Sequence, residues 1–88
     1  MDLSVLREQI DNIDDELLRL FIERMGVSRQ VALYKREHSL PVLNTERENE
    51  VLKAIGEKTD EELRSYALKI YEKILELSRE YQEEIIQT

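Results

Sequence analysis

Two cationic side chains are the clearest candidates for chemistry in this sequence, because both fall on one face of a predicted helix. At 100° per residue, Arg24 and Lys35 lie within about 40° of each other and about 16 Å apart along the axis. Arg24 also interrupts the apolar repeat between Leu20 and Val27, where the spacing calls for a hydrophobic residue. An unpaired charge in an apolar strip costs several kcal/mol, so this face predicts either ion pairs with the chain's own acids or a site for an anion.

Four further polar residues have ordinary structural explanations when each is taken alone. Arg7 lies about 100° from the Arg24 face, where an exposed helix arginine is expected. Asn44 can cap a helix, Arg47 is a normal solvated charge, and Glu48 has the spacing of a capping box. None of the four identifies a site by itself.

The third predicted helix carries two uncharged polar residues, Ser78 and Gln82, one turn apart beside the apolar positions Leu77 and Tyr81. Neutral donors at this spacing suit a ligand oxygen that carries no full charge. In the absence of other information, a serine and a glutamine near a chain end are surface residues.

Most familiar kinds of catalytic machinery are missing from the sequence. It has no cysteine and a single histidine, His38, at the predicted end of a helix. No HExxH motif, glycine-rich phosphate loop or nucleophile with a suitably spaced histidine and acid occurs. We therefore predict no metal, no cofactor and no covalent catalysis.

The apolar residues recur at steps of three and four, which is typical of helices, and no strand pattern is present. We predict an all-α fold with helices at about 3–38, 44–57 and 60–86, and a loop at 39–43 around Pro41. Asn44 or Thr45 can cap the second helix, and Thr59 starts a second capping box.

Composition narrows the class of protein. The chain has 88 residues, 41% of them hydrophobic, and a net charge of −7 from 20 acidic and 13 basic side chains. This predicts one folded domain over residues 1–88 and argues against nucleic acid or anionic lipid as a partner. No apolar run approaches the roughly 20 residues of a membrane span, and no targeting pattern occurs, so we expect a cytoplasmic protein.

The length of the first helix predicts a homodimer. A helix of about 35 residues spans about 50 Å, which the two shorter helices of the same chain cannot cover. Part of its apolar stripe therefore needs a second molecule, and we expect an obligate, intertwined helical homodimer with the long helices packed together.

Taken together, the spaced residues resemble the all-helical (type II) class of chorismate mutases over about residues 3–84. The resemblance implies a three-helix protomer with a very long first helix, and a dimer whose two sites each use both chains. It also implies rearrangement of chorismate to prephenate, a step in phenylalanine and tyrosine biosynthesis that needs no cofactor. Four motifs carry it: Leu6-Arg7-x-x-Ile10-x-x-Ile13-Asp14-x-x-Leu17-Leu18-x-Leu20-x-x-x-Arg24, Val31-x-x-x-Lys35, Pro41-Val42-x-Asn44-x-x-Arg47-Glu48 and Ser78-x-x-x-Gln82.

The resemblance also assigns roles to the cations. It implies that Arg24 and Arg47 bind the substrate carboxylates within their own chain, and that Arg7 reaches into the partner chain's site. Lys35 and Gln82 resemble the two donors to the ether oxygen, on which negative charge builds as the C–O bond breaks.

Three remaining site residues follow from the same motifs. Glu48 resembles the acceptor for the ring hydroxyl, and Ser78 assists a carboxylate or backbone contact. Family members often have Asp at the position of Asn44, so its amide oxygen either keeps the contact with the ring hydroxyl or serves only as a helix cap. The short segment 56–59 implies no added regulatory loop.

Two alternative functions stay open at this point. The first is an isochorismate-pyruvate lyase, which shares the fold and the carboxylate-binding cations but has less use for Glu48. The second is a non-catalytic module, either a coiled-coil dimerisation domain or a regulatory mutase-like domain excised from a fusion protein. A simple coiled coil has no need of Arg24 inside its seam.

Overall fold

The protein consists of three helices in a computed structural model that describes residues 2–88. They are α1 (Leu3–Glu37), α2 (Thr45–Lys58) and α3 (Glu61–Gln87). Each observed end lies within one residue of its predicted position. The all-helical prediction is confirmed, because the described residues contain no strand. None of these helices is long and apolar enough to cross a membrane.

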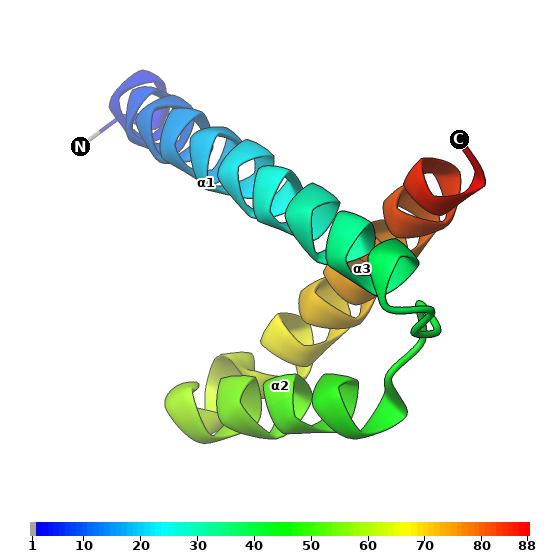
Figure 1. Cartoon of the computed structure of the whole chain (residues 1–88). Coiled ribbons are helices and arrows are strands. Elements are labelled where there is room, and N and C mark those ends of the chain that lie inside the picture. Colours follow the sequence, from blue (N-terminus) through cyan, green and yellow to red (C-terminus); the bar gives the residue numbers. More distant parts are fainter. Residues whose placement is uncertain (1) are drawn as a thin grey trace.

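The helices form an open, elongated arrangement and not a closed bundle. The C-terminal half of α1 crosses α3, and α2 packs along the N-terminal half of α3 (Figure 1). Within the described part of the chain, α1 and α2 do not pack on each other. The molecule measures 54 × 28 × 14 Å, so most of α1 lies against no other element.

Few side chains are buried where the helices cross. The buried apolar residues are Ala32, Leu75 and Ile85, and Ala32 is fully inaccessible because its small side chain lies at the α1–α3 crossing. Three buried polar residues lie beside them: Ser28, Ser78 and Gln82. An interior with as many polar as apolar residues is typical of a binding site more than of a stabilising core.

The helix starts partly contradict the sequence-based prediction. Asn44 caps α2, its Oδ1 accepting the backbone N–H three residues on at 3.0 Å, so Thr45 is already the first helical residue. The capping box predicted from Thr59 is wrong. Thr59 donates its hydroxyl to the carbonyl of Ile55 at 2.6 Å, and Asp60 caps α3 without a side-chain bond. The spacing of a capping box alone does not determine which residue of a short linker becomes the N-cap of the next helix.

Candidate functional site

A cavity of about 310 Å³ lies where the C-terminal half of α1, the start of α2 and the C-terminal half of α3 meet. The loop after α1 closes one end of it. Every predicted site residue except Arg7 lines this cavity: Arg24, Lys35, Asn44, Arg47, Glu48, Ser78 and Gln82. Three separate stretches of sequence therefore meet around one space.

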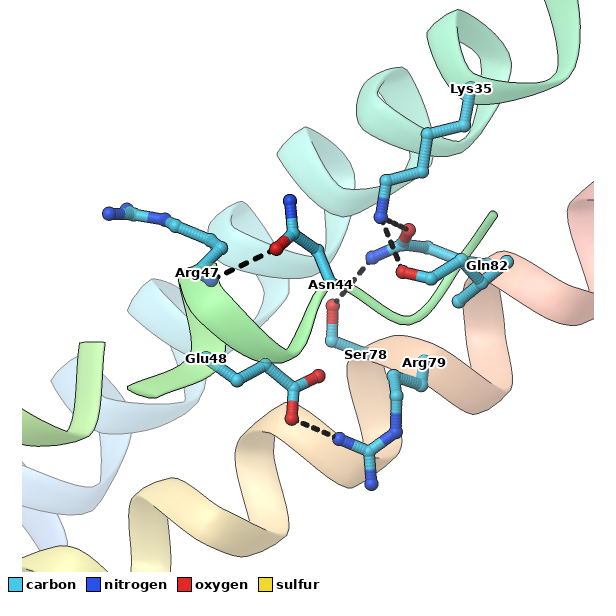
Figure 2. Close-up of polar contacts among 8 residues, drawn as sticks. Lys35, Asn44, Arg47, Glu48, Ser78, Arg79 and Gln82 are labelled. Carbon is cyan, nitrogen blue, oxygen red and sulfur yellow. Dashed lines mark hydrogen bonds and ion pairs between the residues drawn. The ribbon is translucent and has the colours of Figure 1, made fainter. Parts of the chain in front are cut away.

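Lys35 is held at the end of the cavity by two hydrogen bonds (Figure 2). Its Nζ donates to the carbonyl of Val42 at 2.6 Å and to Oε1 of Gln82 at 3.0 Å. An ammonium has three donors, so one N–H stays available to a ligand. Desolvation lowers the pKa of Lys35 below its ordinary value of 10.5, and the nearby Glu48 carboxylate partly opposes that effect.

Gln82 belongs to a buried chain of hydrogen bonds that fixes the direction of its amide. Lys35 can only donate, so it requires Oε1, and the amide Nε2 donates to the hydroxyl of Ser78 at 3.1 Å. The hydroxyls of Ser78 and Ser28 are 2.8 Å apart. One N–H of Nε2 and one N–H of Lys35 therefore have no partner among residues 2–88.

Two further lining residues, Ser28 and Arg79, were missed from the sequence. Arg79 forms an ion pair with Oε1 of Glu48 across the gap between α3 and α2 (Figure 2). The sequence offers only weak signals for either residue. Ser28 lies one turn from Arg24 on the same face, and Arg79 directly follows Ser78.

Two of the three arginines on the cavity wall, Arg24 and Arg47, differ in their surroundings. Arg24 is half-buried, and no acidic side chain among residues 2–88 pairs with it or with Lys35. Ion pairs of Arg24 and Lys35 with acids of the same chain, the alternative to an anion site, are therefore absent among residues 2–88. Arg47 is exposed, pairs with Glu50 at 3.4 Å and points away from Lys35 and Gln82 (Figure 2).

Arg7 lies far from this cavity. It is exposed on the N-terminal half of α1, about 25 Å along the axis from Arg24 at 1.5 Å per residue. No helix of the same chain returns to that end of α1 (Figure 1). Arg7 therefore cannot reach the cavity of its own chain.

The cavity is strongly cationic in an acidic chain. Four cations line it, namely Arg24, Lys35, Arg47 and Arg79, against one carboxylate, Glu48, so the balance is +3 where the whole chain carries −7. The lining includes hydrogen-bond donors at fixed positions but no histidine or cysteine. Fold and site thus define a helical protein with a cavity whose charge suits a multiply charged anion and whose wall carries neutral and cationic donors.

Comparison with known proteins identifies the family. Residues 6–83 match the family model of chorismate mutase type II. The chain is 42% identical over 52 residues to the T-protein of Haemophilus influenzae, an alignment that covers 59% of this chain and 14% of that protein. It is 39% identical over 54 residues to the bifunctional chorismate mutase/prephenate dehydratase of Aquifex aeolicus, covering 61% and 15% respectively.

A third relative is aligned over nearly its full length. The chorismate mutase of Methanocaldococcus jannaschii is 26% identical over 87 residues, which is 97% of this chain and 88% of that protein. No solved structure matches. The chain belongs to the chorismate mutase type II family, and it spans only about one seventh of the first two relatives.

Proposed function

We propose that this chain is a chorismate mutase, which converts chorismate to prephenate by an intramolecular rearrangement. The observation that carries the proposal is that Lys35 and Gln82, bonded to each other in a cavity rich in cations, each keep one N–H without a partner among residues 2–88. Family membership and the names of two relatives, both of which include chorismate mutase, support the same reaction over the lyase and non-catalytic alternatives.

The cations bind and orient the substrate. Chorismate carries two carboxylates and must adopt a compact conformer before its bond rearranges, so charges at both ends select the reactive shape. Arg24 binds one carboxylate from the floor of the cavity. Arg47 leaves its ion pair with Glu50 and turns into the cavity to bind a substrate carboxylate. Its exposed side chain allows this movement.

Lys35 and Gln82 lower the barrier. Negative charge develops on the ether oxygen as the C–O bond breaks, and donors directed at this oxygen bind the transition state more strongly than the substrate. Both donors are held before the substrate arrives, since Lys35 and Gln82 already bond each other at 3.0 Å. Little reorganisation is then needed during the reaction.

The remaining polar residues orient the substrate and the side chain of Gln82. Glu48 accepts a bond from the ring hydroxyl, and Ser78 supports Gln82 through the bond from the amide. For Asn44 we favour the helix-cap role, because its Oδ1 already accepts the backbone N–H of Arg47. Its Nδ2 is then the atom that faces a ligand.

We further propose that the active form is a cytoplasmic, intertwined homodimer in which Arg7 completes the partner chain's site. The support is an apolar face on α1 that nothing in the same chain covers. Leu6, Ile10 and Ile13 are 40%, 55% and 58% exposed and follow the helical repeat that also contains Leu17. An exposed stripe of this length needs a second copy, and the two-fold symmetry of a dimer brings each Arg7 toward the other chain.

The test is the loss of chorismate ultraviolet absorbance on adding purified protein. We expect the wild type to convert chorismate and the Arg24→Ala variant to be inactive. Arg29→Ala, on the opposite and exposed face of the helix, should keep the activity. Isochorismate given to the same protein is expected to yield no salicylate fluorescence. A folded, dimeric wild type without turnover would refute the proposed activity.

A further inference from the structure

Arg79 is the one charged residue on the cavity wall without a role in the proposed reaction. It extends from α3 to the carboxylate of Glu48 on α2 and lines the same space as Lys35. Its side chain is 35% exposed and that of Glu48 is 21% exposed, so the pair lies at the partly solvated edge of the site. A pair at such a position adds little to stability by itself.

Two cations, Arg79 and Lys35, lie near the carboxylate of Glu48. Arg79 binds its Oε1, while Lys35 is near enough for the carboxylate to raise the pKa of its ammonium. Lys35 uses two of its three N–H groups on Val42 and Gln82. If Arg79 were absent, the third N–H of Lys35 would be open to Glu48, which lies close enough to favour the charged ammonium.

We propose that Arg79 is a positioning residue that keeps Glu48 away from Lys35. By binding Oε1, Arg79 turns Oε2 toward the ligand and leaves the third N–H of Lys35 for the oxygen on which charge develops. This inference rests on the proposed mutase activity. It makes a prediction that the activity alone does not, because it concerns a residue that does not touch the reacting atoms.

A purely structural role for the same ion pair has different consequences. If Arg79 only clamps α2 to α3, its loss loosens the start of α2 that carries Asn44 and Arg47. Substrate binding and thermal stability then suffer, so KM rises and Tm falls. If Arg79 positions Glu48, the chemical step suffers and kcat falls while KM and Tm change little.

The experiment compares Arg79→Met with Arg79→Lys, each in the wild-type and the Glu48→Gln backgrounds. We expect Arg79→Met to lower kcat about 10-fold or more, with KM within about 3-fold, and Arg79→Lys to recover most of the loss. In the Glu48→Gln background, Arg79→Met is expected to change kcat less than about 2-fold, because no carboxylate remains to capture Lys35. Arg79→Gln serves as the second uncharged variant if Arg79→Met does not fold.

The alkaline limb of the kcat/KM profile, compared between the wild-type and the Glu48→Gln backgrounds, provides a readout that distinguishes positioning from a clamp. The charged groups around Lys35 are Arg24 on α1, Arg47 and Glu48 on α2, and Arg79 on α3. Capture of Lys35 by Glu48 favours the charged ammonium, so Arg79→Met moves the limb to higher pH, and by more with Glu48 present than in the Glu48→Gln background.

The outcomes separate the inference from its premise. A wild type without turnover overturns both. If the wild type is active, two results for Arg79→Met overturn the inference but not the activity. The first is a kcat within about 2-fold of the wild type, and the second is a raised KM and a lowered Tm without a loss of kcat. The same holds if the kcat loss is as large in the Glu48→Gln background.

Discussion

The two halves of α1 share one apolar repeat but have opposite surroundings. Residues 2–20 are all exposed, including every apolar side chain among them, whereas Ser28 and Ala32 in the other half are buried against α3. Figure 1 shows the N-terminal half extending past the crossing with no element beside it. The repeat therefore specifies which face of the helix is to be covered but not which chain covers it.

The site repeats this division. The C-terminal half of α1 provides Arg24 and Lys35 to the cavity of its own chain, while Arg7 on the other half is left without a site. In our account the second chain of the dimer covers the apolar stripe of α1, and its site also receives Arg7. The predictions below separate the contributions of the two halves.

The largest effect is expected from the C-terminal half. Lys35→Ala removes a donor to the reacting oxygen, and one such donor is typically worth about 3–4 kcal/mol, so kcat should fall about 100-fold or more. Lys53→Ala is the control, since Lys53 is exposed on α2 and pairs only with Glu57 at 4.0 Å. Steady-state chorismate turnover measures both. A loss below about 10-fold would remove Lys35 from the central role.

Substitutions in the N-terminal half of α1 should act by disrupting the dimer. Ile13→Lys places a charge on the apolar stripe twice in a symmetric dimer, and we expect a monomer at micromolar concentration that has lost most of its turnover. Asp15→Lys on the opposite face of the helix introduces the same residue and should stay dimeric. Sedimentation velocity distinguishes the species. A dimeric, active Ile13→Lys protein would show that this stripe is not the interface.

The alkaline side of the pH profile should report the titration of Lys35. Gln82 carries no charge, so the rate should be nearly flat from about pH 6 to 9. Desolvation puts the pKa of Lys35 below 10.5, so activity should decline before that pH as the ammonium loses its proton. A bound dianion favours the charged form, and the limb for kcat should therefore lie at higher pH than the limb for kcat/KM. A titration between pH 6 and 9 would contradict these assignments.

The same pKa shift has a consequence for folding. Folding disfavours the charged form of Lys35, so this residue lowers the stability of the free protein at neutral pH. As pH rises through the lowered pKa, the folded protein releases its proton first and that destabilisation fades. Glu48 partly opposes the effect.

The smallest effect is expected at Gly26, near the junction of the two halves. Gly26 is exposed within α1, and a Cβ built there meets no atom within 4 Å. Gly26→Ala should raise the free energy of unfolding by about 1 kcal/mol, the usual helix-interior gain. Gly56→Ala lies nearer a helix end and should gain less. Thermal melts compare the two, and destabilisation by Gly26→Ala would indicate that a second chain packs closely there.

Sequence reasoning located the helices well because their ends have local causes. Pro41 disfavours helical geometry at Leu40, and Asn44 and Asp60 are residue types that favour helix starts. The spacing of Arg24 and Lys35 predicted one shared face, and both line the same cavity. The family resemblance drawn from the spaced motifs is confirmed by the family model.

Sequence reasoning failed where tertiary contacts decide. Thr59 has capping-box spacing, yet its hydroxyl bonds the preceding helix. Ser28 and Arg79 become site residues only because α3 crosses α1 beside Gln82 and brings Glu48 within reach. Periodicity along one helix carries no information about which residues of another helix lie opposite.

The most direct test of the shared site is to mix two inactive variants. Arg7→Ala and Lys35→Ala proteins, unfolded together and refolded, should form heterodimers in which one site has both residues intact. With random pairing, half the dimers are mixed and half their sites are intact, so about a quarter of wild-type turnover should return. If the mixture stays as inactive as its components, each Arg7 does not serve the other chain's Lys35, and the central claim is wrong.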